Sequence, residues 1–145
     1  ALIISSSGCN IVPIDMAELL QKEGIKVVAI VTGDHLKAST SKRADGKKLS
    51  DFADLVIDTG APAGDSMIYV DGLDTPVSPG STVGGVMIIN SIKAELARLL
   101  TRAGHPPKVL TAGCVVGAEK ASALFEAAYD EHGRRLAQLL QNAGQ

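Results

Sequence analysis

The chain has 145 residues and a formal net charge of -2, which suits one domain with a real core and predicts no nucleic-acid partner. Hydrophobic residues make up 46%, but there is no Trp and only two Phe and two Tyr, so no stacking platform for single-stranded nucleic acid is expected. This aliphatic composition is typical of a parallel sheet covered by helices. The clustered basic residues are interpreted as a solvated loop: Lys42, Arg43, Lys47 and Lys48.

Cysteine usage and hydropathy favour a cytoplasmic protein without metal or cofactor. Cys9 and Cys114 are too few and too widely spaced for a disulfide framework or a zinc site. Residues 1–5 are apolar but too short for a signal peptide, and no run reaches the length of a transmembrane helix. We therefore expect no membrane contact.

The first third of the chain has the pattern of a βαβ unit. Strand, helix and strand follow one another within about 30 residues, so the two strands should be parallel with a right-handed crossover. The helix has Pro13 in its first turn, Gly24 past its end, and an apolar stripe of Met16, Leu19 and Leu20. The expected elements are a buried strand over residues 1–5, a small-residue loop over 6–10, a helix over Val12–Lys22, and a strand over Lys26–Val31 that is buried on both faces.

The middle and end of the chain complete an α/β pattern. The long helix is apolar around much of its circumference, which predicts a central helix or an oligomer contact. Together the elements predict one domain, a three-layer α/β sandwich with a mostly parallel sheet of about five strands. The elements expected after the βαβ unit are a polar loop over Thr32–Gly46, a short helix over Lys47–Ala53, a strand over Leu55–Ile57, a hairpin from Met67–Val70 through Asp71-Gly72 to residues 75–77, the long helix over Thr82–Ala103 with Ser81 as N-cap, a strand over Lys108–Thr111, and a helix over Ala118–Gln141.

The segment Ser5-Ser6-Ser7-Gly8-Cys9-Asn10 carries the strongest chemical signal. It joins a buried strand to a helix start, which places it at the carboxyl end of a parallel strand, where α/β proteins bind ligands. A phosphate there meets free backbone N–H groups and the positive end of the helix dipole, and Gly8 lets the backbone approach closely. The alternative is a Ser-rich turn in which Asn10 only caps the helix.

The loop resembles the Ser-x-Ser-Gly-x-Thr/Asn phosphate loop of SIS (sugar isomerase) domains. The resemblance continues through Val27–Val31, Gly46-Lys47-Lys48-Leu49, Ala53–Asp58, Pro79–Val83 and Asn90–Glu95, and it is closest to a phosphoheptose-isomerase-like bacterial branch. It implies a flavodoxin-type strand order, a dimer, and sugar-phosphate binding by Ser5, Ser6, Ser7 and Asn10. It also implies that the chain is the C-terminal part of a larger protein, without the family's first strand, N-terminal helices and second phosphate loop.

Three residues are candidates for the acid–base steps of aldose–ketose isomerisation. His35 follows a strand, and histidine is a side chain suited to proton transfer, although a solvated loop His is the simpler interpretation. Glu95 lies on the long helix, where the resemblance implies catalytic Glu and His but this sequence has Asn90 and no His. His132 lies on a late helix that can enter a neighbouring subunit's site in SIS proteins, or it is a surface residue. A non-catalytic sugar-phosphate sensor is therefore the alternative to an isomerase.

Other polar residues are weaker candidates. Ser81 and Thr82 open the long helix, where they cap it or bind a substrate hydroxyl or second anion. Cys9 lies near a helix start, where a thiolate is favoured, but no partner base is evident. No Gly-x-Gly-x-x-Gly follows a strand, which argues against a dinucleotide site.

Overall fold

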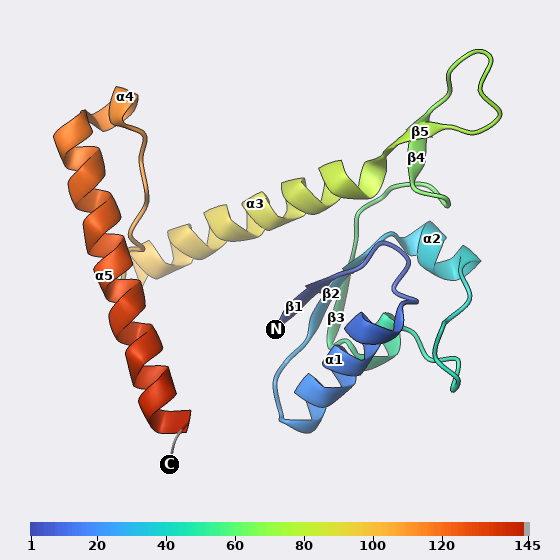
Figure 1. Cartoon of the computed structure of the whole chain (residues 1–145), viewed down its shortest axis with the longest axis horizontal. Helices are drawn as coiled ribbons and strands as arrows, with labels where there is room; N and C mark the ends of the chain where they lie inside the picture. The colour runs from blue at the N-terminus through green and yellow to red at the C-terminus, as the bar shows by residue number, and fades with distance from the viewer. Residues whose placement is uncertain (144–145) are drawn as a thin grey trace. The chain divides into compact units, whose positions relative to one another are not determined.

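The computed structural model describes residues 1–143, and the chain divides into two compact units, 1–93 and 94–145, which are described separately. The α-helices and strands are labelled in Figure 1. In chain order they are β1 (Leu2–Ile4), α1 (Ile11–Lys22), β2 (Val28–Val31), α2 (Gly33–Ala38), the 3-10 helix η1 (Leu49–Phe52), β3 (Leu55–Asp58), β4 (Ser66–Ile68), β5 (Val77–Pro79), α3 (Gly80–Arg102), α4 (Gly113–Val116) and α5 (Ala118–Ala143).

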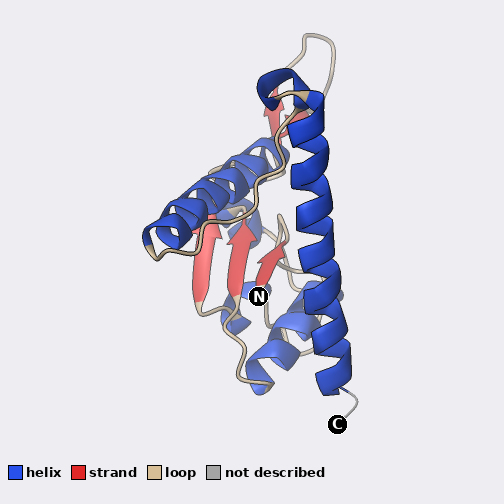
Figure 2. Cartoon of the chain, turned by 90° about the vertical axis from the view of Figure 1, so that its left-hand side faces the viewer, coloured by secondary structure: helices blue, strands red, loops and turns tan. Residues whose placement is uncertain are grey.

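The first unit is built on a three-stranded parallel sheet in the order β1-β2-β3, whose strands lie side by side and point the same way in Figure 2. Leu2 pairs with Val28, and Val28 pairs with Leu55, so the three strands end at the same edge. The predicted parallel βαβ unit and third strand are confirmed. Within residues 1–143, however, this sheet has three strands instead of about five, and β4 and β5 form the separate antiparallel hairpin that the turn signals predicted.

The core lies between α1, η1 and one face of the sheet. The small side chain of Ala29 at the centre of β2 lets α1 approach, and β2 is buried on both faces as predicted. On α1 the buried residues are Ile14 and Ala17, whereas Met16 and Leu19 are exposed, so the predicted stripe was wrong for these two residues. The buried cluster contains Ile14, Ala17, Val27, Ala29, Val31, Leu49 and Phe52.

The polar stretch after β2 is the predicted loop only over residues 39–46, because residues 33–38 form the short helix α2. Leu36 N–H donates to Thr32 C=O over 2.8 Å, and Gly33 N–H is held by Asp58 from the end of β3. Asp34 in the first turn and Lys37 in the last turn suit the helix dipole and pair with each other. That charge order was the available sequence signal.

The long helix α3 begins at Gly80, so Ser81 lies inside it and is not its N-cap. Asp65 takes the capping role: its carboxylate accepts the backbone N–H of Ser81 over 2.7 Å and also the Ser81 hydroxyl. Gly80 and Gly84, one turn apart, allow a close approach to the chain after β3. A Cβ at Gly84 would lie 2.7 Å from the carbonyl oxygen of Thr59.

In the second unit, the predicted strand over Lys108–Thr111 is wrong, because these residues have no regular structure. Pro106 and Pro107 offer no N–H for a ladder, and the Lys108 ammonium instead contacts α5, through Ala127 C=O at 2.9 Å and Glu131 at 3.0 Å. The last helix is confirmed as α5. None of the helices in the described part of the chain is both long and apolar enough to cross a membrane.

Gly8 is the residue on which the turn from β1 into α1 depends. Its φ of +61° is in the left-handed region, and it is buried. An added Cβ would lie 2.7 Å from Leu36 Cδ1 and 3.5 Å from both Leu49 and Val31. Glycine adopts this dihedral angle without strain and leaves the Leu36 side chain its place.

We predict that Gly8→Ala lowers the free energy of unfolding by about 3 kcal/mol, from the left-handed backbone and the clash with Leu36 combined. Gly46→Ala is the matched control, because Gly46 has a φ of +73° but open space around it. A loss of about 1 kcal/mol in the free energy of unfolding is expected for this variant. Urea unfolding of both variants measures the difference. Equal losses would show that the packing around Gly8 is not restrictive.

Candidate functional site

Hydroxyl groups line the carboxyl edge of the parallel sheet. Ser6 follows β1, Thr32 follows β2 and Thr59 follows β3. The Ser6 hydroxyl donates to Thr32 Oγ1 over 3.3 Å, and Thr32 Oγ1 lies 2.8 Å from Thr59 Oγ1. Thr32 is fully buried, so this row of hydroxyls ties the first strand end to the other two. The backbone bonds from Ser5 N–H to Ile30 C=O and from Thr32 N–H to Ser6 C=O hold the Ser-rich loop on the same edge.

The hydrogen bonds of the loop distinguish its serines. The Ser6 hydroxyl donates its proton to Thr32 Oγ1, whereas the Ser7 hydroxyl oxygen accepts the Cys9 N–H over 3.3 Å and its proton remains free to donate. No hydrogen bond of the Ser5 hydroxyl is formed within residues 1–143. Ser5 and Ser7 therefore each keep a hydroxyl proton to donate to an anion, and of the two the Ser7 hydroxyl is the one that a backbone N–H also holds in the turn.

The same turn also carries backbone donors. The N–H groups of Ser6, Ser7 and Asn10 have no acceptor among the described residues, while Gly8 N–H closes the turn onto Ser5 C=O at 3.1 Å. Asn10 is the N-cap of α1 by position but makes no side-chain capping bond, so the alternative in which it only caps the helix is not what the structure has. Its amide group and the first turn of α1 add further donors.

One half of the loop is closed by the chain that follows α2. Leu49 N–H donates to Gly8 C=O over 2.8 Å, and Lys42 N–H donates to Cys9 C=O over 2.9 Å. Cys9 is 2% exposed, and its thiol contacts Ser39 C=O, so it is not the accessible thiol that a reactive cysteine requires. Ser5, Ser6 and Ser7 remain half-buried and Asn10 is exposed. The turn is thus held by hydrogen bonds from the segment after α2, while its serines and Asn10 remain accessible.

His35 lies on α2, at the same sheet edge. Its Nδ1 accepts the Gly64 N–H over 2.8 Å, so in the neutral ring the proton is on Nε2. His35 is half-buried and fixed between α2 and the loop before β4. It is therefore not a solvated loop histidine, and Nε2 is the atom left for exchange of a proton.

Asp58 fixes the two glycines that flank this edge. Its Oδ1 accepts the N–H of Gly33 over 2.8 Å and that of Gly60 over 2.9 Å. These two bonds, that of Gly33 first, lower the pKa of Asp58 below its ordinary value of 3.8. A Cβ at Gly33 would lie 2.3 Å from Asp58 Oδ2, so the carboxylate and α2 are in close contact.

The other predicted site residues are not brought to this edge within the first unit. Glu95 and His132 belong to the second unit. Arg98 donates to both carboxylate oxygens of Glu95 and so lowers its pKa. His132 is exposed on α5, and Ser81 donates its hydroxyl to Asp65, next to Thr82 in α3.

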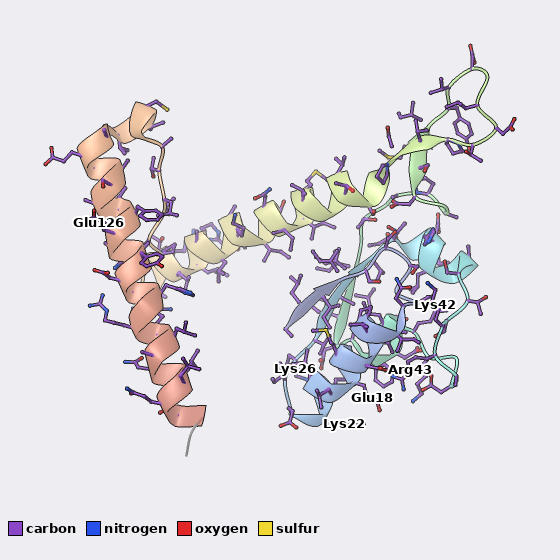
Figure 3. The ribbon with its side chains drawn as sticks, in the orientation of Figure 1. Glu18, Lys22, Lys26, Lys42, Arg43 and Glu126 are labelled. Atoms are coloured by element: carbon purple, nitrogen blue, oxygen red, sulfur yellow. The ribbon has the colours of Figure 1, made fainter. Side chains whose placement is uncertain are left out.

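Sequence reasoning missed Thr32, Thr59 and Asp58. Each lies at or just after the end of a strand that was predicted, so their position at the carboxyl edge was a usable signal. It also missed Lys42, whose ammonium lies 2.7 Å from Asn10 Oδ1 beside the start of α1 (Figure 3). No local pattern joins these two residues, because they are 32 positions apart.

Comparisons with known proteins place the chain beside a set of bacterial relatives. No family model matches it. It is 36% identical over 141 residues to a UPF0309 protein of Listeria monocytogenes serotype 4b, covering 97% of this chain and 56% of the relative. UPF0309 proteins of Geobacillus thermodenitrificans and Thermoanaerobacter pseudethanolicus are 35% and 36% identical, with 92% and 82% of this chain and 49% of each relative covered. The chain thus spans about half the length of these relatives.

We predict that Asp58→Asn lowers the free energy of unfolding by about 1 kcal/mol at pH 7, because the acceptor oxygen is kept but its charge is lost at an exposed site. The folded-state pKa of Asp58 is lowered, so its charge stabilises the fold above the unfolded-state pKa and this contribution disappears as the pH falls through the folded-state value. The difference between the urea midpoints of the two proteins should therefore be smaller at about pH 3 than at pH 7.

Asp71→Asn in the β4–β5 turn is the control for that experiment, since Asp71 is exposed and makes no side-chain bond within the described chain. It should match the parent protein at both pH values. A loss for Asp58→Asn that is the same at pH 7 and about pH 3 would contradict the assigned charge effect.

Proposed function

We propose that the chain binds a sugar phosphate at the junction of β1 and α1, as SIS domains of the phosphoheptose-isomerase-like branch do. The observation that supports this most is the set of unused donors in the turn: the N–H groups of Ser6, Ser7 and Asn10 together with the Ser7 hydroxyl. Directional donors at a helix start suit the oxygens of a phosphate group. Ser5 and the Asn10 amide complete the proposed phosphate contacts.

The proposal includes a larger fold around this site. The parallel strands β1, β2 and β3 would belong to a three-layer sandwich with flavodoxin-type strand order, of which residues 1–145 form the C-terminal portion as one domain. Leu2, Ile4 and Leu55 support this, because these strand residues are 41%, 55% and 54% exposed. Parallel sheets normally bury both faces, so further chain is expected over them.

Binding without turnover fits the contacts of the candidate catalytic residues better than isomerisation does. The carboxylate of Glu95 is paired with Arg98, which lowers its pKa and weakens it as a base. His35 has one ring nitrogen engaged by Gly64 and one left, and His132 would have to act from elsewhere in an assembly. A sugar-phosphate sensor is therefore the second candidate function, and His35 is the residue that distinguishes the two.

Assembly and location are further parts of the proposal. We propose a homodimer or higher homo-oligomer, because α3 exposes Val83, Val86 and Met87 at 63%, 58% and 65%. A cytoplasmic location follows from the proposed sugar-phosphate ligand. We propose no cofactor or metal, and neither nucleic acid nor membrane as partner.

We predict that Ser7→Ala weakens sugar-phosphate binding about tenfold, because the loop loses a hydroxyl donor to a charged ligand. Ser6→Ala is the matched control. Its hydroxyl donates to Thr32, so a change of about threefold or less is expected. A thermal-shift screen of sugar phosphates identifies the ligand, and calorimetric titration of that ligand measures both variants. Equal affinity of Ser7→Ala and the parent protein would remove the phosphate from this loop.

Turnover of the same ligand separates the two candidate functions. If the protein is an isomerase that uses His35, His35→Ala should lose at least about a hundredfold in kcat and keep its affinity for the sugar phosphate. His105→Ala, at a histidine of the second unit, is the control and should leave kcat unchanged. Binding without isomerisation by the parent protein would establish the sensor instead.

A further inference from the structure

The four clustered basic residues make different contacts in the structure: Lys42, Arg43, Lys47 and Lys48. Arg43 is a structural residue: its guanidinium contacts the carboxylates of Glu18, Asp45 and Asp15 at 2.8, 2.8 and 3.2 Å. Its side chain is only 17% exposed. Lys22 and then Arg43 lower the pKa of Glu18 to about 2, so this cluster stays ionised. The positive charge of Arg43 is therefore balanced within the protein.

The two lysines next to η1 are also engaged in the fold. Lys48 donates to the carbonyl oxygens of Leu36 and Ser39 over 2.6 and 2.7 Å, which holds the end of α2. Lys47 lies over the ring of Phe52, with its ammonium 5.1 Å from the ring centroid. The interpretation of this cluster as a solvated loop is thus wrong for Arg43 and Lys48.

Lys42 differs from these residues. Its ammonium has no carboxylate partner among residues 1–143, and its one side-chain bond goes to Asn10 Oδ1. Its backbone N–H donates to Cys9 C=O, so the residue is anchored to the Ser-rich loop itself. Figure 3 shows Lys42 beside the start of α1. The ammonium keeps two further protons for a ligand held by the same loop.

The charge at this position can be compared with that of candidate anions. A helix N-terminus acts as roughly half a positive charge, and Lys42 adds one, giving about +1.5. A phosphate monoester carries about −1.5 to −2 at pH 7, whereas a diester carries about −1. The loop with Lys42 therefore matches a monoester, and without Lys42 it would be undercharged.

We propose that Lys42 is a specificity-determining residue of the Ser5–Asn10 loop, which makes this loop select dianionic phosphate monoesters over monoanionic ligands. The proposal rests on the proposed function, and it adds a residue that the resemblance did not supply. Asn10 has two roles in it: its carbonyl oxygen positions the Lys42 ammonium, and its NH₂ group remains as a donor.

The test uses two ions of similar chemistry and different charge. Inorganic phosphate is mainly a dianion at about pH 7.5, and dimethyl phosphate is a monoanion. Amide chemical shifts of the full chain are followed by NMR during titration with each ion. Lys42→Ala should weaken phosphate binding about tenfold and dimethyl phosphate binding about threefold or less. Lys42→Arg keeps the charge and should restore the preference for phosphate.

Lys47→Ala is the matched control, because it removes the same charge from an exposed lysine five positions away and should leave both affinities unchanged. If phosphate shifts the amides of Ser6, Ser7 and Asn10 but Lys42→Ala binds it as the parent protein does, the role of Lys42 is overturned and the phosphate loop stands. The role of Lys42 is also overturned if Lys47→Ala loses as much affinity for phosphate as Lys42→Ala does. If phosphate shifts none of these amides, the proposed function and the role of Lys42 both fail.

Discussion

The close packing at Gly8 is the constraint on which the rest of the first unit depends. Its left-handed backbone lets the chain turn from β1 into α1 within a space bounded by Leu36, Leu49 and Val31. The carbonyl groups of Gly8 and Cys9 then accept N–H groups from Leu49 and Lys42, which ties the chain after α2 to the same turn. The N–H groups of Ser6, Ser7 and Asn10 in the same turn have no acceptor among the described residues. The turn that packs against the core is thus also the turn that carries these unused donors.

The segment from Ser39 to Leu49 contacts both the buried core and the start of α1. Leu49 belongs to the buried cluster, and Arg43 fastens the segment to α1 through Glu18 and Asp15. Within this fixed segment, Lys42 is the basic residue that reaches the start of α1. A flexible loop would lose entropy in positioning such a charge, whereas this segment is already ordered by its buried contacts.

Local patterns predicted the regular elements well where the pattern was long. The β-branched run of β2 and the periodicity of α3 and α5 were sufficient, and so were the turn signals of the β4–β5 hairpin. Prediction failed where a distant contact decides the structure. α2 depends on Asp58, 25 positions from Gly33, and the start of α3 depends on Asp65, 16 positions from Ser81. The Ser-rich loop was visible in the sequence. The different roles of the Ser6 and Ser7 hydroxyls could not be predicted, because they depend on the position of Thr32.

The burial of Cys9 has a consequence for the dynamics of this region. Its thiol lies under the segment that covers the loop, with Ser39 C=O as its contact, so a thiol reagent can reach it only when that segment lifts away. The rate of alkylation then follows the population of this locally opened state. Cys114 is exposed and would react without any such opening. The two cysteines together give the protein an intrinsic probe of local unfolding and its own reference.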